Sequence, residues 1–444
     1  MAELSPILQF PLEIIWRIFD HVVEDHIEEK EWSALPFKPA TVLASVCRPW
    51  RQAALGHSAL WARIIIPPCS YEDIRDVPQI IRTSLERAAT RPLLLRVYKN
   101  EWLPLVTSSS TQWHELHLYH PSANNTGLAS VPGHIPNLHK LMFIVNLFNL
   151  FFNDSDDEDS ENLGPTTAFS NAPHLREVDL VVATTKHIIL PWAQLTHLRC
   201  RWQTATGCLQ ILQQTTNLQV LELAVTDDWQ DNATVVLHHL RVLTVKMTVK
   251  GADLPQLVLP EKEAAHSILG HLTLPSLRHF TIELGPLSLS LTFVSQLIEC
   301  SNFPLESLSL LGLGFKDELL AFAGITSLSQ ITVQLTLHRY DSEQNTYEII
   351  ERLATDATVF AALRELVFLP PLDFECSLDL YDNVVLLLQA RPQLKRFHFD
   401  ARPSLPLNCR AQTLQTLIAL AGEGRDIRIH DFSGIVEESG NGHG

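Results

Sequence analysis

Residues 175–180 read Leu-Arg-Glu-Val-Asp-Leu, and the spacing of their apolar side chains decides the fold class. Val178 and Leu180 alternate with polar residues, as in a short strand with one buried face. The same apolar-x-x-apolar-x-apolar pattern occurs eleven times, beginning at Trp113, Leu138, Leu175, Leu195, Leu218, Leu240, Leu277, Leu305, Leu328, Leu363 and Leu394. Helical stretches precede several copies, and Pro or Asn commonly stands just before the repeat leucine. Each such copy therefore predicts a helix, a turn and a strand.

The first sixty residues carry a helical pattern instead. Pro11 is followed by apolar residues at helical spacing, Ile15 and Phe19 among them, and proline is well accommodated at the first position of a helix. Ile14 and Ile18 lie off this stripe, so the helix is apolar around much of its circumference. We therefore expect it to pack on its own unit on one side and on a partner on the other.

Three blocks of this region resemble the F-box family. Residues 10–19, FPLEIIWRIF, resemble its opening, L-P-x-E-[LI]-[LI]-x-x-I-[FL]; residues 43–51, LASVCRPWR, resemble its V-C-[RK]-x-W half; and residues 60–64, LWARI, resemble the L-W-x-x-[IL] that often follows. Phe10 replaces the usual leucine, and the gap at residues 24–38 is longer than usual.

The resemblance implies a three-helix unit that docks on the Skp-family adaptor of a cullin–RING ubiquitin ligase. The residues that it places on or beneath the adaptor-facing surface are Pro11, Ile14, Ile15, Ile18, Phe19, Val46, Cys47 and Trp50. A plain three-helix cap on the following domain is the alternative.

The repeats resemble the irregular leucine-rich repeats found behind F-boxes, a style abundant in mushroom-forming fungi. Their mean step is about 28 residues, inside the ~20–29 of that class, although no asparagine follows each strand at the usual ladder position. We therefore expect an α/β protein: a three-helix F-box in residues 1–66, a bridging segment in 67–112, an irregular leucine-rich-repeat-like αβ solenoid in 113–436, and a disordered tail in 437–444.

The parallel strands of such a solenoid would line one surface, with the polar residues between the buried ones facing it. We expect a target protein to bind there, although an ordinary solvated face explains any single position equally well. The candidate residues are Glu177, Asp179, His197, Arg199, Arg201, Glu222, Lys246, His279, Glu283, Arg396 and His398.

Composition limits the classes of partner and the compartments that the sequence favours. The net charge of −17 argues against broad binding to nucleic-acid phosphates, which needs clustered Lys and Arg. The most apolar run, residues 141–152, is shorter than the ~20 residues of a membrane span. Seven scattered cysteines without a C-x-x-C pair, together with an N-terminus that lacks the secretory pattern, favour the cytoplasm and/or nucleus.

Signals of bond chemistry are weak. The sequence contains no G-x-S-x-G elbow, no G-x-x-x-x-G-K-[ST] loop and no G-x-G-x-x-G, so we expect neither an enzyme nor a cofactor. His114, His117 and His120 invite a metal reading, but in a strand their side chains do not converge, and we expect no metal site.

Residues 153–161, NDSDDEDSE, form an acidic run that repels itself, which predicts a disordered loop over 153–163. A regulatory alternative centres on Ser155, because Glu158 three positions later suits an acidophilic kinase. A phosphate there would extend the loop further.

Together, these observations predict a substrate-recognition subunit of an SCF-type cullin–RING ubiquitin ligase. Its helical unit would dock the Skp-family adaptor, and its repeats would bind a target protein that the sequence does not identify. The alternative is a non-catalytic repeat scaffold that mediates protein–protein interaction without directing degradation.

Overall fold

The computed structural model describes residues 10–29, 38–66, 77–98, 102–119, 133–145, 165–183, 187–225, 234–247, 264–284, 291–313, 319–335, 342–369, 378–399 and 410–429, with the single residues 128, 131 and 185. Ser155, the acidic loop 153–163 and the tail 437–444 lie outside this part of the chain. Among the helices within these ranges, none combines the length and apolar character needed to cross a membrane.

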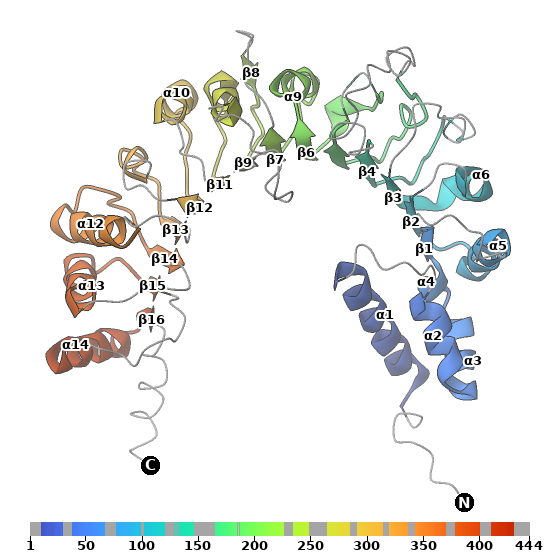
Figure 1. Ribbon diagram of the computed structural model, residues 1–444, viewed down its shortest axis with the longest axis horizontal. Helices are drawn as coiled ribbons and strands as arrows, with labels where there is room; N and C mark the ends of the chain where they lie inside the picture. The colour runs from blue at the N-terminus through green and yellow to red at the C-terminus, as the bar shows by residue number, and fades with distance from the viewer. Residues whose placement is uncertain are drawn as a thin grey trace, which may run out of the picture. The chain divides into compact units, whose positions relative to one another are not determined.

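The described chain is an α/β protein with a parallel sheet of 14 strands, which follow one another in chain order (Figure 1). Strands β8 (Val235–Val236) and β10 (Leu272–Thr273) pair only with each other. The chain divides into two compact units, Met1–Arg201 and Trp202–Gly444.

The first unit opens with four helices and continues with strands. The helices are α1 (Leu12–Glu29), α2 (Lys38–Val46), α3 (Arg48–Gly56) and α4 (Ser58–Trp61). The elements that follow are β1 (Arg63–Ile66), α5 (Val77–Ala88), β2 (Leu93–Val97), α6 (Leu103–Val106), the 3-10 turn η3 (Thr107–Gln112), β3 (Trp113–Tyr119), β4 (Lys140–Ile144), β5 (Glu177–Val181), the 3-10 turn η5 (Trp192–Gln194) and β6 (His197–Gln203).

The second unit repeats strands and helical segments. Its first half contains α9 (Ala205–Leu212), β7 (Val220–Val225), β8, β9 (Val242–Met247), the 3-10 turn η6 (Ala264–His271), β10, β11 (His279–Leu284) and α10 (Leu291–Ser301). Its second half contains β12 (Ser307–Leu313), β13 (Gln330–Leu335), α12 (Ser342–Thr355), β14 (Glu365–Leu369), α13 (Leu378–Ala390), β15 (Arg396–Phe399), α14 (Ala411–Gly422) and β16 (Asp426–Ile429).

The core lies between the strands and the helices that join them. In β15, Phe397 and Phe399 are buried, whereas Arg396, the first residue of the strand, is exposed, as alternation along a strand requires. The Phe368 ring of β14 lies 6.4 Å from Phe397 and 6.0 Å from Phe399. Helices α12, α13 and α14 lie along one side of these strands (Figure 1), so the polar residues occupy the other face.

A row of backbone carbonyls sets the register at the strand starts. The Arg278 carbonyl accepts the N–H groups of Glu306 and Ser307 at 2.8 and 2.9 Å, and the Glu306 carbonyl accepts those of Ser329 and Gln330, both at 3.0 Å. The same double acceptance occurs at the carbonyls of His139, Arg176, Gln219, Arg241, Ser329 and Arg364. We call these positions the carbonyl row. Each of them directly follows the leucine that begins a copy of the repeat pattern.

All eleven sequence copies coincide with strands, from β3 to β15. The parallel series nevertheless begins earlier than predicted, because β1 and β2 pair with each other and β2 pairs with β3. Within residues 67–112, the described ranges 77–98 and 102–112 contain α5, β2, α6 and η3. Trp61, Ile64 and Ile66, at the end of the helical unit and in β1, also have the repeat spacing and are buried. Just before β2, Pro92 stands three residues ahead of Leu95, at the spacing where the other copies carry a large apolar residue, and so interrupts the pattern.

Candidate functional site

Helices α1 and α3 are joined by side-chain contacts that fix their relative position. The indole Nε1 of Trp16 donates to the Ala53 carbonyl at 3.0 Å, and the Trp16 ring stacks on His57 with centroids 5.1 Å apart. His57 Nε2 in turn lies 2.8 Å from Asp20 Oδ1 on α1. The helices are therefore a packed unit with a defined outer surface.

The inside of this unit is small. Phe19 is fully buried and meets the Trp50 ring edge-on at 5.1 Å, while Ile15 and Leu43 are also buried. A core of this size leaves much of the apolar material of the helices outside.

The exposed apolar side chains of the described residues are concentrated on these helices. Ten large apolar residues are exposed in the described part of the chain. Seven of them belong to the short region from Phe10 to Leu55: Phe10, Leu12, Ile14, Val22, Val42, Val46 and Leu55. We call these seven the apolar helical surface. Val46 is 57% exposed, and Val42, one helical turn earlier on the same face of α2, is 54% exposed. Because large exposed apolar patches are typical of interaction sites, this surface is the candidate site of the helical unit.

The predicted adaptor residues divide between this surface and the core. Pro11, Ile14 and Val46 are exposed, and Ile18, Cys47 and Trp50 are half-buried. Ile15 and Phe19 lie inside the unit, where they support the surface without reaching it. The sequence reasoning missed Phe10, Leu12, Val22, Val42 and Leu55 as surface residues. Val42 could have been found, because it lies next to the buried Leu43 and one turn from Val46.

On the polar face of the first unit, charged residues pair with one another. Asp179 is only 4% exposed and accepts two hydrogen bonds from Arg201, at 3.1 Å from Nε and 2.7 Å from Nη2. This carboxylate is therefore occupied within the sheet and presents little surface to a partner.

A second cluster surrounds Glu115 on β3. Its Oε1 lies 2.6 Å from His117 Nε2 and 2.8 Å from the Lys140 ammonium. Burial alone would raise the pKa of Glu115, but the hydrogen bonds and positive charges of these two neighbours outweigh it and lower the pKa from 4.5 to about 2. Glu115 consequently remains ionised at neutral pH.

The second unit shows the same internal pairing. The Lys246 ammonium lies 3.0 Å from Glu222 and 3.7 Å from Glu283, so three of the predicted target-binding residues neutralise one another in part. Such half-exposed ion pairs contribute about 0–1 kcal/mol each and are readily exchanged.

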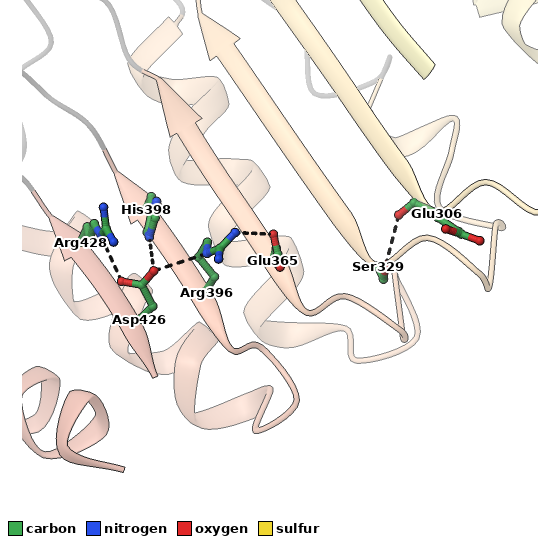
Figure 2. Close-up of polar contacts among 7 residues, drawn as sticks. All are labelled: Glu306, Ser329, Glu365, Arg396, His398, Asp426 and Arg428. Carbon is green, nitrogen blue, oxygen red and sulfur yellow. Dashed lines mark hydrogen bonds and ion pairs between the residues drawn. The ribbon is translucent and has the colours of Figure 1, made fainter. Parts of the chain in front are cut away.

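Figure 2 shows the corresponding cluster on β14 to β16. Arg396 lies 2.9 Å from Glu365 and 3.4 Å from Asp426, and His398 Nε2 lies 2.9 Å from Asp426. Burial tends to raise the pKa of Asp426, but its hydrogen bonds with His398 and Arg428 lower it overall.

Most of the predicted target-binding strip is thus paired within the sheet, Glu177 facing His139 at 3.8 Å included. His197, Arg199 and His279 are exposed members of the strip, and His197 Nδ1 lies 3.0 Å from the Thr196 hydroxyl. The strip is better described as an internally compensated polar face than as a row of available charges.

The histidines of β3 have other partners than a metal. The His114 ring stacks on His139 at 5.5 Å, His117 pairs with Glu115, and His120 lies outside the described residues. In the part of the chain that the structure describes, no three His, Cys, Asp or Glu side chains gather in a way that could hold a metal ion.

Neither a protein-family model nor a curated protein sequence matches this chain.

Proposed function

We propose that the protein is a substrate-recognition subunit of a cullin–RING ubiquitin ligase and that the apolar helical surface binds a Skp-family adaptor. The observation that carries the proposal is the concentration of exposed apolar side chains at α1 to α3. Four of the seven, Phe10, Leu12, Ile14 and Val46, lie in the blocks that resemble an F-box. Burying such side chains contributes about 1.5–3 kcal/mol each, so a few of them suffice for a micromolar complex.

The strands and helices that follow would form an irregular leucine-rich-repeat-like solenoid that holds a target protein. In this role the protein breaks and forms no bonds itself. It raises the effective concentration of the target near the ligase, which is sufficient to direct modification.

Binding to a purified Skp-family adaptor, measured by calorimetry with the full chain, tests the proposal. Ile14→Asp and Val46→Asp place a charge on the apolar helical surface and should abolish a micromolar complex, because an unpaired buried charge costs several kcal/mol. Ile189→Asp and Val236→Asp are matched controls, since these residues are 40% and 47% exposed away from the helices. Retained binding by Ile14→Asp and Val46→Asp, or no binding by the wild type, would refute adaptor docking.

A further inference from the structure

The carbonyl row of the second unit is basic, in a chain whose overall net charge is −17. Three of its six residues are cationic and one is anionic; in strand order they are Gln219, Arg241, Arg278, Glu306, Ser329 and Arg364. Lys395 stands at the same place in the next copy, where its carbonyl accepts the Asp426 N–H alone. We call Arg241, Arg278, Arg364 and Lys395 the basic edge. Glu306 and Ser329, which belong to the same row, are seen at the starts of their strands in Figure 2.

Backbone hydrogen bonds set the spacing of the basic edge. The Arg278 N–H donates to the Arg241 carbonyl at 2.9 Å, and the Lys395 N–H donates to the Arg364 carbonyl at 2.7 Å. The cations therefore form two pairs on neighbouring strands, separated by Glu306 and Ser329. Strands lie ~4.8 Å apart, so the row from Arg241 to Lys395 spans about 24 Å, the length of roughly seven extended residues.

Most charged residues of the polar face are paired with one another, but three cations of the basic edge are not. Arg241, Arg364 and Lys395 are exposed, and none of them has an ion pair or a side-chain hydrogen bond within the described ranges. Arg278 shares its charge with Glu306 at 2.9 Å. Two carboxylates at the starts of β14 and β16, those of Glu365 and Asp426, are held by Arg396.

We propose that the basic edge binds an acidic, extended segment of a partner protein. Guanidinium groups bind carboxylates through paired hydrogen bonds, and two pairs of cations along one edge suit an extended chain that passes across the strand starts. The proposal supplies the chemistry of the target and in that sense rests on the proposed recruitment function, but direct binding tests it without the adaptor.

Fluorescence anisotropy of a labelled octaglutamate peptide, titrated with the full chain at low salt, provides the test. The variant Arg241→Gln/Arg364→Gln/Lys395→Gln should bind about tenfold more weakly, since each exposed charge pair contributes about 0.2–1 kcal/mol. Arg17→Gln/Arg48→Gln/Arg82→Gln is the charge-matched control, because these three residues are also exposed but lie on other elements. The control should retain wild-type affinity, and affinity should fall as salt rises.

Lys395→Gln alone, with an expected loss of about twofold, supports the same conclusion if the triple variant folds poorly. Equal losses in both triple variants, or no binding of octaglutamate by the wild type, would overturn the proposal. Tighter binding of a charge-matched oligonucleotide, lost in the same variant, would overturn it in favour of nucleic acid. Adaptor binding is unaffected by any of these outcomes, so the two proposals fail separately.

Discussion

Arg391 is a fully buried arginine whose removal should destabilise the second unit. Its guanidinium donates to the carbonyls of Leu353 at 2.7 Å, Asp356 at 2.8 Å, Val359 at 2.6 Å and Phe360 at 3.0 Å. It thereby joins the start of the β15 repeat to the end of α12 and the turn that follows. Burial lowers the pKa of Arg391, and the charge of Asp356 opposes this effect.

The size of the effect follows from these acceptors. The Asp356 and Phe360 carbonyls also accept backbone N–H groups, whereas those of Leu353 and Val359 have Arg391 as their sole hydrogen-bond donor among the described residues. Arg391→Met would leave two buried carbonyls unpaired, at about 1–3 kcal/mol each, and would recover part of the cost of burying a charge. We therefore expect the free energy of unfolding to fall by about 2–4 kcal/mol.

Urea unfolding followed by circular dichroism measures this loss, and Arg396→Met is the matched control. Arg396 is 46% exposed and makes only surface ion pairs, so its replacement should cost less than about 1 kcal/mol. Arg391→Lys, which keeps the charge but has a single donor group, should fall between them. A midpoint for Arg391→Met at the wild-type value, or no lower than that of Arg396→Met, would refute the reasoning.

Three further predictions concern single contacts. The folded-state pKa of Glu115 is lowered to about 2, so the ionised side chain contributes up to about 3 kcal/mol to folding above pH ~4.5, and this contribution is lost as the pH falls toward 2. In Glu115→Gln, the free energy of unfolding should therefore depend less on pH over that interval, and an unchanged pH dependence would contradict this. Asp179→Asn should lower the free energy of unfolding in urea by about 1–3 kcal/mol, because Arg201 loses its paired acceptor. The double variant Asp179→Asn/Arg201→Met should recover part of this loss. Thr204→Ala removes the side-chain oxygen that accepts the Gly207 N–H at 3.0 Å at the start of α9 and should cost about 1 kcal/mol; hydrogen exchange as slow as in the wild type at that first turn would exclude the cap.

The strands were predictable because burial on one face leaves a period of two in the sequence, and all eleven copies became strands. Strand β16 was missed because Gly424 stands where a repeat leucine would be, although Ile427 and Ile429 are buried like the others. Here the neighbouring strand determined the structure, through the Asp426 N–H that donates to the Lys395 carbonyl.

The site was less predictable, because it depends on which polar groups meet across strands. Asp179 and Arg201 are 22 residues apart in the chain, and only the register brings them together. On α1, Ile14 and Ile15 are equally apolar in sequence, but the fold buries Ile15 and leaves Ile14 exposed. The cations of the basic edge were visible in the sequence, whereas their exposure and lack of partners were not.

The double acceptances of the carbonyl row are made by main-chain atoms, so they do not depend on which side chain a row position carries. The Ser329 hydroxyl adds a side-chain hydrogen bond to the Glu306 carbonyl at 3.2 Å. Steps between copies vary from 20 to 37 residues, while the double acceptance at the strand starts recurs. One residue inserted between a repeat leucine and its strand would turn every side chain of that strand to the opposite face of the sheet. Insertion of a whole copy would leave the faces of the existing strands unchanged. Substitution at a row position can therefore exchange one charge for another without a structural penalty, so recognition along this edge can diverge rapidly on a constant backbone.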